Sequence, residues 1–193
     1  MLNMLGGAAT FVSGAAVAVF AEPLRRWIYR PKLQLEFGSS PEYQARTDEG
    51  IAPNLHEAIY IRVKVTNTKS AIAKSCRAYL VAIEKEGEAD EFKPTIYCDS
   101  IPIAWACRDE NEKYGAVDLP KGVAQFIDVI STRDAQPMGV HIKFCPYRYA
   151  KIYQEPGTYR FTIQVSGENV EPVFIKVVFS WTGTWDKYAA YKG

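Results

Sequence analysis

The sequence predicts an all-β fold, an antiparallel β-sandwich, with one transmembrane helix at its amino terminus. Three observations predict it. Several segments alternate apolar and polar residues with a period of two, which is typical of half-buried strands. No window beyond residue 32 has a sustained helical period. Residues 1–21 contain no charged side chain, and a cluster of cations follows them at once.

The uncharged amino-terminal stretch has the length of a membrane span. A helix rises about 1.5 Å per residue, so 21 residues cross roughly the ~30 Å hydrocarbon core of a bilayer. A buried core helix and a signal peptide cleaved after Ala21 are the alternatives. A signal peptide carries its positive charge before the apolar core, whereas here the cations come after it. We therefore expect a transmembrane anchor over residues 1–24.

Residues 25–32 form a basic juxtamembrane segment. Cations on this flank oppose its translocation, so we expect the amino terminus outside and the carboxyl-terminal domain in the cytoplasm. Tryptophan and tyrosine between the cations suit the same membrane interface. The candidate membrane-interface residues are Arg25, Arg26, Trp27, Tyr29, Arg30 and Lys32.

The predicted span also contains a row of small residues. Gly6, Thr10, Gly14 and Ala18 recur at every fourth position and would share one helix face. Such a face lets a second helix approach closely. Homo-oligomerisation through this helix is therefore a hypothesis.

Composition limits the function classes of the remaining chain. The formal net charge is +1, which gives no broad field for nucleic acid, and we expect no nucleic-acid partner. Cysteines stand at 76, 98, 107 and 145 without a C-x-x-C pair, and the chain has 2 histidines, so no metal site is expected. Because Cys76 and Cys107 fall in phase with apolar neighbours, buried free thiols are preferred, with disulfides as the alternative.

The sandwich is expected over residues 33–183, with a tail at 184–193. The strongest alternation runs through Ile59, Ile61, Val63 and Val65. The polar residues 38–55 indicate a loop, and the acidic run at 84–91 indicates a hairpin tip. Strands are predicted at 33–37, 58–67, 76–84, 92–97, 101–107, 123–130, 159–165 and 173–181.

Two segments carry a family resemblance. Residues 157–161, Gly-Thr-Tyr-Arg-Phe, resemble the tyrosine corner of immunoglobulin-like domains, with Phe161 where antibody domains have a disulfide cysteine. Residues 63–80 resemble the second and third strands of CARDB-like immunoglobulin modules. More loosely, the chain resembles uncharacterised prokaryotic membrane-anchored proteins that carry such a domain. The resemblance implies an immunoglobulin-like sandwich and by itself no function.

Motifs for catalysis are missing from the sequence. It contains no G-x-S-x-G, H-E-x-x-H, Walker or dinucleotide-binding loop, so no catalytic residue, cofactor or enzyme activity is expected. His141 is expected on the surface, because it lies on the polar face of a short strand. A cleft that joins Asp118, Asp128 and His141 would favour an enzyme instead.

The best candidate interaction surface interleaves aromatic and basic residues. Aromatic rings supply rigid apolar area, and arginine supplies a fork of donors. The candidate partner-binding residues are Tyr147, Arg148, Tyr149, Lys151 and Tyr153, and the alternative is that they pack on the open end of the sandwich. A second aromatic cluster, expected to fold back over an edge strand, comprises Trp181, Trp185, Tyr188 and Tyr191.

These observations favour a membrane-anchored, non-catalytic binding or scaffolding module with a cytoplasmic sandwich. Its expected partners are the lipid bilayer and a protein of unknown identity. The alternative is an exported or surface-exposed sandwich that binds glycan or a surface protein through Trp105 or the tyrosine segment.

Overall fold

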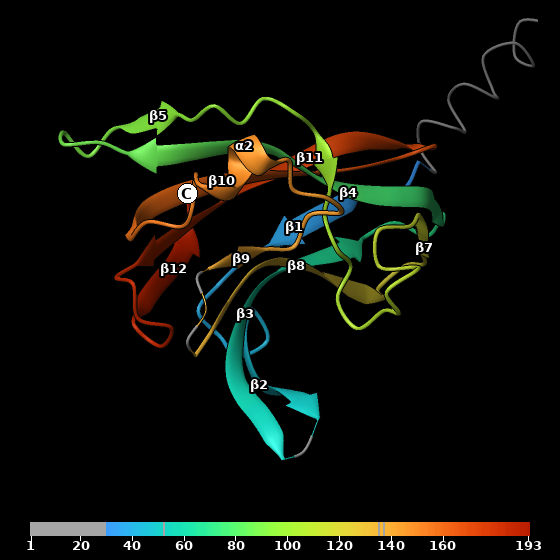
Figure 1. Ribbon diagram of the computed structural model, residues 1–193. Helices are drawn as coiled ribbons and strands as arrows, with labels where there is room; N and C mark the ends of the chain where they lie inside the picture. The colour runs from blue at the N-terminus through green and yellow to red at the C-terminus, as the bar shows by residue number, and fades with distance from the viewer. Residues whose placement is uncertain (1–29, 52, 135, 137) are drawn as a thin grey trace, which may run out of the picture.

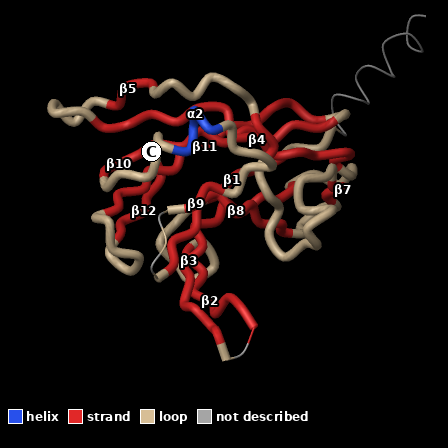
Figure 2. Tube along the Cα trace, in the orientation of Figure 1, coloured by secondary structure: helices blue, strands red, loops and turns tan. Residues whose placement is uncertain are grey.

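The computed structural model describes residues 30–51, 53–134, 136 and 138–193. Within these residues the protein is all-β, as predicted: strands dominate and one short helix is present (Figure 2). The strands are β1 (Leu33–Glu36), β2 (Gln44–Ile51), β3 (Asn54–Asn67), β4 (Ala73–Glu86), β5 (Phe92–Pro94), β6 (Ile101–Pro102), β7 (Val117–Leu119), β8 (Ala124–Arg133), β9 (Gly139–Val140), β10 (Gly157–Gly167), β11 (Val170–Trp181) and β12 (Tyr188–Lys192). The helix is α2 (Tyr147–Ala150).

The strands form two sheets that face each other (Figure 1). The first sheet has the order β1-β3-β8-β9, with β2 also paired to β3. The second has the order β12-β11-β10-β4-β5, with β6 and β7 also paired to β4. All pairings between these strands are antiparallel. β3 and β4 follow each other in the chain but lie in opposite sheets, so this connection joins the two sheets around one core.

The core lies between the sheets. Ile61, Val63 and Val65 point inward from β3 and are at most 1% exposed, while Phe161 and Ile163 of β10 are fully buried. They belong to one cluster of apolar side chains. Burying each such side chain stabilises the fold by about 1.5–3 kcal/mol. The predicted alternation of β3 and β10 is therefore confirmed.

The prediction of a loop over residues 38–55 was wrong for its second half. Residues 44–51 form β2, which pairs with β3 from Gln44 opposite Ile61 to Ile51 opposite Asn54. Residues 54–57, the first residues of β3, are exposed. This hairpin projects away from the sheets in Figure 1. A strand with solvent on both faces needs no apolar alternation, so its sequence carries no strand signal.

The predicted strand over residues 101–107 is mostly a crossing between the sheets. Only Ile101 and Pro102 form a strand, β6, against β4. Ile103 and Trp105 then bridge residues of the opposite layer, Ile142 and Ile127. Ile103 and Trp105 are buried, but so are Ala104 and Ala106, so burial does not alternate along this segment. The predicted strand at 92–97 is also shorter, because β5 ends at Pro94.

A corner and an edge complete the second sheet. The Tyr159 hydroxyl donates a 2.8 Å hydrogen bond to the backbone oxygen of Glu155, and the side chain is fully buried. At the edge, β12 pairs with β11, and the Tyr188 ring stacks on Phe179 with centroids 5.6 Å apart. The end of the chain thus covers the edge of β11.

The cysteines are all free, but the prediction that they are buried holds only for Cys76. Burial raises the pKa of the Cys76 thiol to about 11. Cys98, Cys107 and Cys145 are exposed. Cys107 was predicted to be buried, but its backbone has a positive φ of 57°, which turns it out of the crossing segment.

Candidate functional site

The tyrosine segment at 147–153 forms α2 and the turn after it, and the structure divides its residues between core and surface. Tyr149 is fully buried and Tyr153 is 7% exposed. The Tyr149 ring packs on Tyr97, with centroids 4.8 Å apart. Tyr147 is 81% exposed, and Lys151 also lies on the surface. Two of the five candidate residues therefore hold the segment in place, and three face solvent.

A polar network fixes α2 to the segment that follows β5. The Tyr149 hydroxyl donates a 2.5 Å hydrogen bond to Oδ2 of Asp99, and Arg148 donates one of 2.7 Å to the same oxygen. These two donors lower the pKa of Asp99. Burial and the hydrogen bond to Asp99 raise the pKa of Tyr149. The carboxylate thus stays ionised and holds Arg148 in one orientation.

Two thiols border this network. Cys98 Sγ lies 3.4 Å from the Tyr149 hydroxyl, and Cys145 Sγ lies 3.1 Å from the Tyr153 hydroxyl. Burial, together with the contact to Cys145, raises the pKa of Tyr153. Both hydroxyls remain protonated at neutral pH and can serve as hydrogen-bond donors or acceptors for the thiols.

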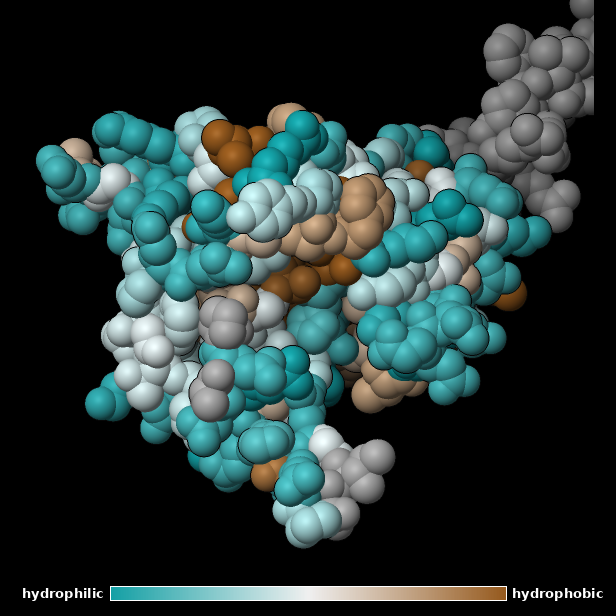
Figure 3. Space-filling model, viewed as in Figure 1, coloured by the Kyte–Doolittle hydropathy of each residue, from teal (hydrophilic) through white to brown (hydrophobic). Residues whose placement is uncertain are grey.

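The surface around α2 carries large apolar side chains. Ile96 is 64% exposed and Phe144 is 59% exposed. Ile96 directly precedes Tyr97, which packs on Tyr149 of α2, and Phe144 directly precedes Cys145, which contacts Tyr153 just after α2. We call the exposed group Ile96, Phe144, Tyr147, Arg148 and Lys151 the α2 patch. Figure 3 shows hydrophobic atoms at the surface beside α2.

Sequence analysis found part of this patch and missed the rest. Ile96, Asp99 and Phe144 were not predicted to belong to the site. Asp99 lies 49 residues from its partner Arg148. No local pattern connects segments so far apart. Nothing in the sequence marks Ile96 and Phe144 as exposed.

The three residues that would have favoured an enzyme are not assembled into one cleft. Asp118 lies on β7 of the second sheet and accepts a 2.8 Å hydrogen bond from the Ser75 backbone. Asp128 lies on β8 of the first sheet and pairs with Arg62. Among the described residues, no hydrogen bond or ion pair joins Asp118 to Asp128 or His141.

His141 was expected on the surface, but it is half-buried. Its ring stacks on Tyr60 with centroids 5.1 Å apart, and its Nε2 atom is buried without a hydrogen-bond partner. Burial, with the nearby cations Lys113 and Arg133, lowers the pKa of His141 to about 4. The imidazole is therefore neutral at physiological pH.

Trp105, the candidate glycan-binding residue, is also inside. It is 1% exposed, and its indole nitrogen donates a 3.1 Å hydrogen bond to the Gly115 backbone. In the tail cluster, Trp181 is buried whereas Tyr191 is 49% exposed. No group of three potential metal ligands occurs in the part of the chain that the structure describes.

The basic flank is described only at its end. Arg25, Arg26, Trp27 and Tyr29 lie outside the described residues, as does the predicted anchor. Within residues 30–193, the structure contains no helix long and apolar enough to cross a membrane. Arg30 and Lys32 line a cavity of about 590 Å³ beside β1.

No protein-family model matches the chain, and no curated protein matches it at a significant level.

Proposed function

We propose that the protein is a membrane-anchored, non-catalytic binding module, whose immunoglobulin-like sandwich lies in the cytoplasm and binds a protein partner through the α2 patch. The α2 patch is the observation that carries this proposal. A group of exposed aromatic, aliphatic and basic side chains has the composition of protein-binding surfaces.

Strand order supports the immunoglobulin-like class. Immunoglobulin domains pair strands A, B and E in one sheet and strands C, F and G in the other. Here β1, β3 and β8 take the positions of strands A, B and E, and β4, β10 and β11 take those of strands C, F and G. The hydroxyl of Tyr159, at the start of β10, bonds the backbone four residues upstream, as in a tyrosine corner. The departures include β2, which pairs with β3, β9, which follows β8, and the added strand β12.

The fixed orientation of Arg148 supports binding. Ordering a side chain at an interface costs about 0.5–1.5 kcal/mol. The Arg148 guanidinium is already held by Asp99 and lies over the Tyr149 ring, with Cζ 4.6 Å from its centroid. Lys151 Nζ lies 5.8 Å from the Tyr147 ring centroid. Part of this cost is therefore met before a partner arrives.

The cytoplasmic placement rests on the sequence and on the thiols. Arg30 and Lys32 end the basic flank that opposes translocation. Cys98, Cys107 and Cys145 are exposed and unpaired, which suits a reducing compartment. A reporter fused after Gly193 tests the topology. A cytoplasmic signal is expected, and a signal from outside would reject this placement.

Photocrosslinking tests the patch in cells that express the full chain. A photoreactive phenylalanine analogue at Phe144 is expected to form one discrete protein adduct. The adduct should disappear when Tyr147→Ser is added, because the aromatic anchor of the patch is lost. It should persist with Phe174→Ser, which removes another exposed ring, on β11. An adduct that both changes leave intact would reject the patch.

A further inference from the structure

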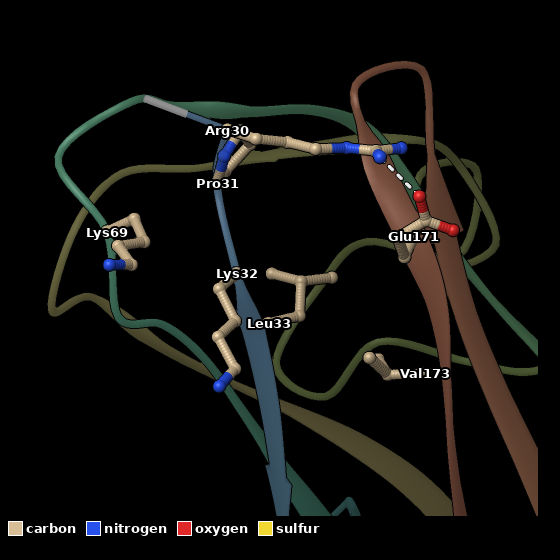
Figure 4. Close-up of a pocket in the computed structure, with 7 residues that line it drawn as sticks. All are labelled: Arg30, Pro31, Lys32, Leu33, Lys69, Glu171 and Val173. Carbon is tan, nitrogen blue, oxygen red and sulfur yellow. Dashed lines mark hydrogen bonds and ion pairs between the residues drawn. The ribbon is translucent and has the colours of Figure 1, made fainter. Parts of the chain in front are cut away.

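A cavity opens beside the start of β1, where the chain leaves the predicted anchor (Figure 4). Its volume is about 590 Å³. Among the described residues that line it, three are cationic and one is acidic, which leaves an excess of positive charge. The lining residues are Arg30, Pro31, Lys32, Leu33, Lys69, Glu171 and Val173.

Hydrogen bonds fix the backbone at two of the cationic residues, Lys32 and Lys69. The backbone oxygen of Lys32 accepts hydrogen bonds from both the amide and the hydroxyl of Thr68, at 2.9 and 3.1 Å. The buried Asn67 side chain accepts a 3.1 Å bond from the Lys69 amide. It also donates 2.6 and 2.9 Å bonds to the backbone oxygens of Ala71 and Leu119. The backbones that present Lys32 and Lys69 are thus fixed to one another and to the fold.

The third cation bridges to the second sheet. Arg30 forms an ion pair with Glu171 at the start of β11, and it also donates a 3.4 Å hydrogen bond to the backbone oxygen of Asn169. Figure 4 shows this side chain spanning the rim of the cavity. Among the described residues, Lys32 and Lys69 line the cavity and have no carboxylate partner, so their charges are not compensated.

The interior of the cavity is apolar. Leu33 is 4% exposed, Val173 is half-buried, and Pro31 is buried. Figure 4 shows Leu33 and Val173 between β1 and β11, below the pair of Arg30 and Glu171. A lining that combines uncompensated cations with apolar side chains matches a ligand with an anionic head and a hydrocarbon body. A soluble phosphate compound would gain nothing from the apolar side chains.

We propose that this cavity binds the phosphate-bearing head of an anionic phospholipid, with Lys32 and Lys69 on the phosphate and with Leu33 and Val173 against the glycerol and the first acyl carbons. The proposal deepens the proposed function, because it rests on the membrane anchor that places the cavity at the bilayer surface. Anionic lipids attract basic juxtamembrane segments in general. A walled cavity adds selection for one lipid at a defined place.

Native mass spectrometry of the full chain in neutral detergent tests the site. Phosphatidylglycerol is the anionic probe, and phosphatidylcholine is its zwitterionic counterpart. We expect one phosphatidylglycerol to be retained at least tenfold more tightly than phosphatidylcholine. Lys32→Glu with Lys69→Glu should weaken this retention at least tenfold, because the phosphate then meets two carboxylates.

A matched double variant controls for net charge. Lys143→Glu with Lys187→Glu makes the same charge change at two exposed positions outside the cavity. Retention should change less than twofold. Equal losses in both double variants would show binding to overall charge and overturn the site, as would no loss in the first.

Two further arms separate a lipid from a soluble phosphate. Glycerophosphoglycerol, the head of the same lipid without acyl chains, should displace it only at concentrations at least a hundredfold higher. Val173→Thr should weaken lipid retention several-fold, because it makes this part of the lining polar at nearly constant volume. Displacement by glycerophosphoglycerol at equal concentration would overturn the lipid as the ligand.

This assay is independent of topology. In detergent the cavity is accessible whichever side of the membrane the domain occupies. A reporter after Gly193 found outside would therefore reject the cytoplasmic placement and leave the lipid site standing. Loss of the site in the assay would leave the α2 patch untouched.

Discussion

Arg62 donates a 2.7 Å hydrogen bond from Nε to Oδ1 of Asp128, and the two side chains are only 20% and 12% exposed. The pair joins β3 to β8 at the irregular point in their register, between Ile61 and Arg62. It thus ties together the two longest strands of the first sheet.

Breaking this pair should destabilise the fold strongly. Arg62→Met leaves the Asp128 carboxylate without its partner in a desolvated place, which costs about 3–5 kcal/mol. Replacing both residues, with Arg62→Met and Asp128→Leu, should recover most of that loss. Urea unfolding measures both. Arg46→Ala, which removes an exposed pair with Glu57, is the control and should cost under about 1 kcal/mol.

The hydrogen bond of the tyrosine corner should contribute measurably to the free energy of unfolding. Tyr159→Phe keeps the buried ring and removes the 2.8 Å bond to the Glu155 oxygen. The expected loss in the free energy of unfolding is about 1 kcal/mol. Tyr147→Phe removes a hydroxyl from a side chain that is 81% exposed and should change nothing measurable. Equal unfolding midpoints for the two variants would show that the corner does not contribute.

Thiol labelling should distinguish the four cysteines. Cys76 is fully buried and its pKa is raised to about 11, so almost none of it is thiolate at neutral pH. Iodoacetamide should therefore modify three sites in the native protein, at 98, 107 and 145, and a fourth after unfolding. The mass of the intact chain counts the adducts. Rapid native labelling of Cys76 would contradict its placement in the core.

The strands that could be predicted from the sequence are those with one face buried in the core. Apolar and polar residues alternate in β3 and β10 because one face of each strand meets the core. Buried residues such as Val63 and Phe161 therefore follow the sequence pattern. β2 has no core face, and its pairing with β3 decides its conformation. Trp105 lies in a segment that was predicted to be one strand. The segment instead crosses between the sheets, and no local sequence pattern indicates such a crossing.

The candidate site was predictable only where it is contiguous in the chain. Tyr147 and Arg148 are neighbours, and their mixed aromatic and basic character is visible in the sequence. Asp99, which orients Arg148, comes from a distant segment. Lys69 likewise reaches the basic flank only through the hydrogen bonds of Thr68 with Lys32. Both relationships are products of tertiary packing.

The stability of the protein should fall in mild acid because of His141. Burial lowers its folded pKa to about 4, against about 6.5 in the unfolded chain. Between these values the unfolded state binds a proton that the folded state does not, so stability rises with pH. The contribution is therefore fully present above pH ~6.5 and is lost progressively toward pH ~4, up to about 3 kcal/mol.

His141→Phe isolates this contribution. The phenyl ring can keep the stacking on Tyr60, and the change removes the buried Nε2 atom that has no partner. At pH 7 we expect the variant to be as stable as the natural chain, or slightly more stable. Its advantage should grow as the pH falls from ~6.5 to ~4, because the natural chain alone must then keep its histidine unprotonated. Urea unfolding at several pH values measures this difference. A difference that stays constant across that range would show that His141 titrates normally and is open to water.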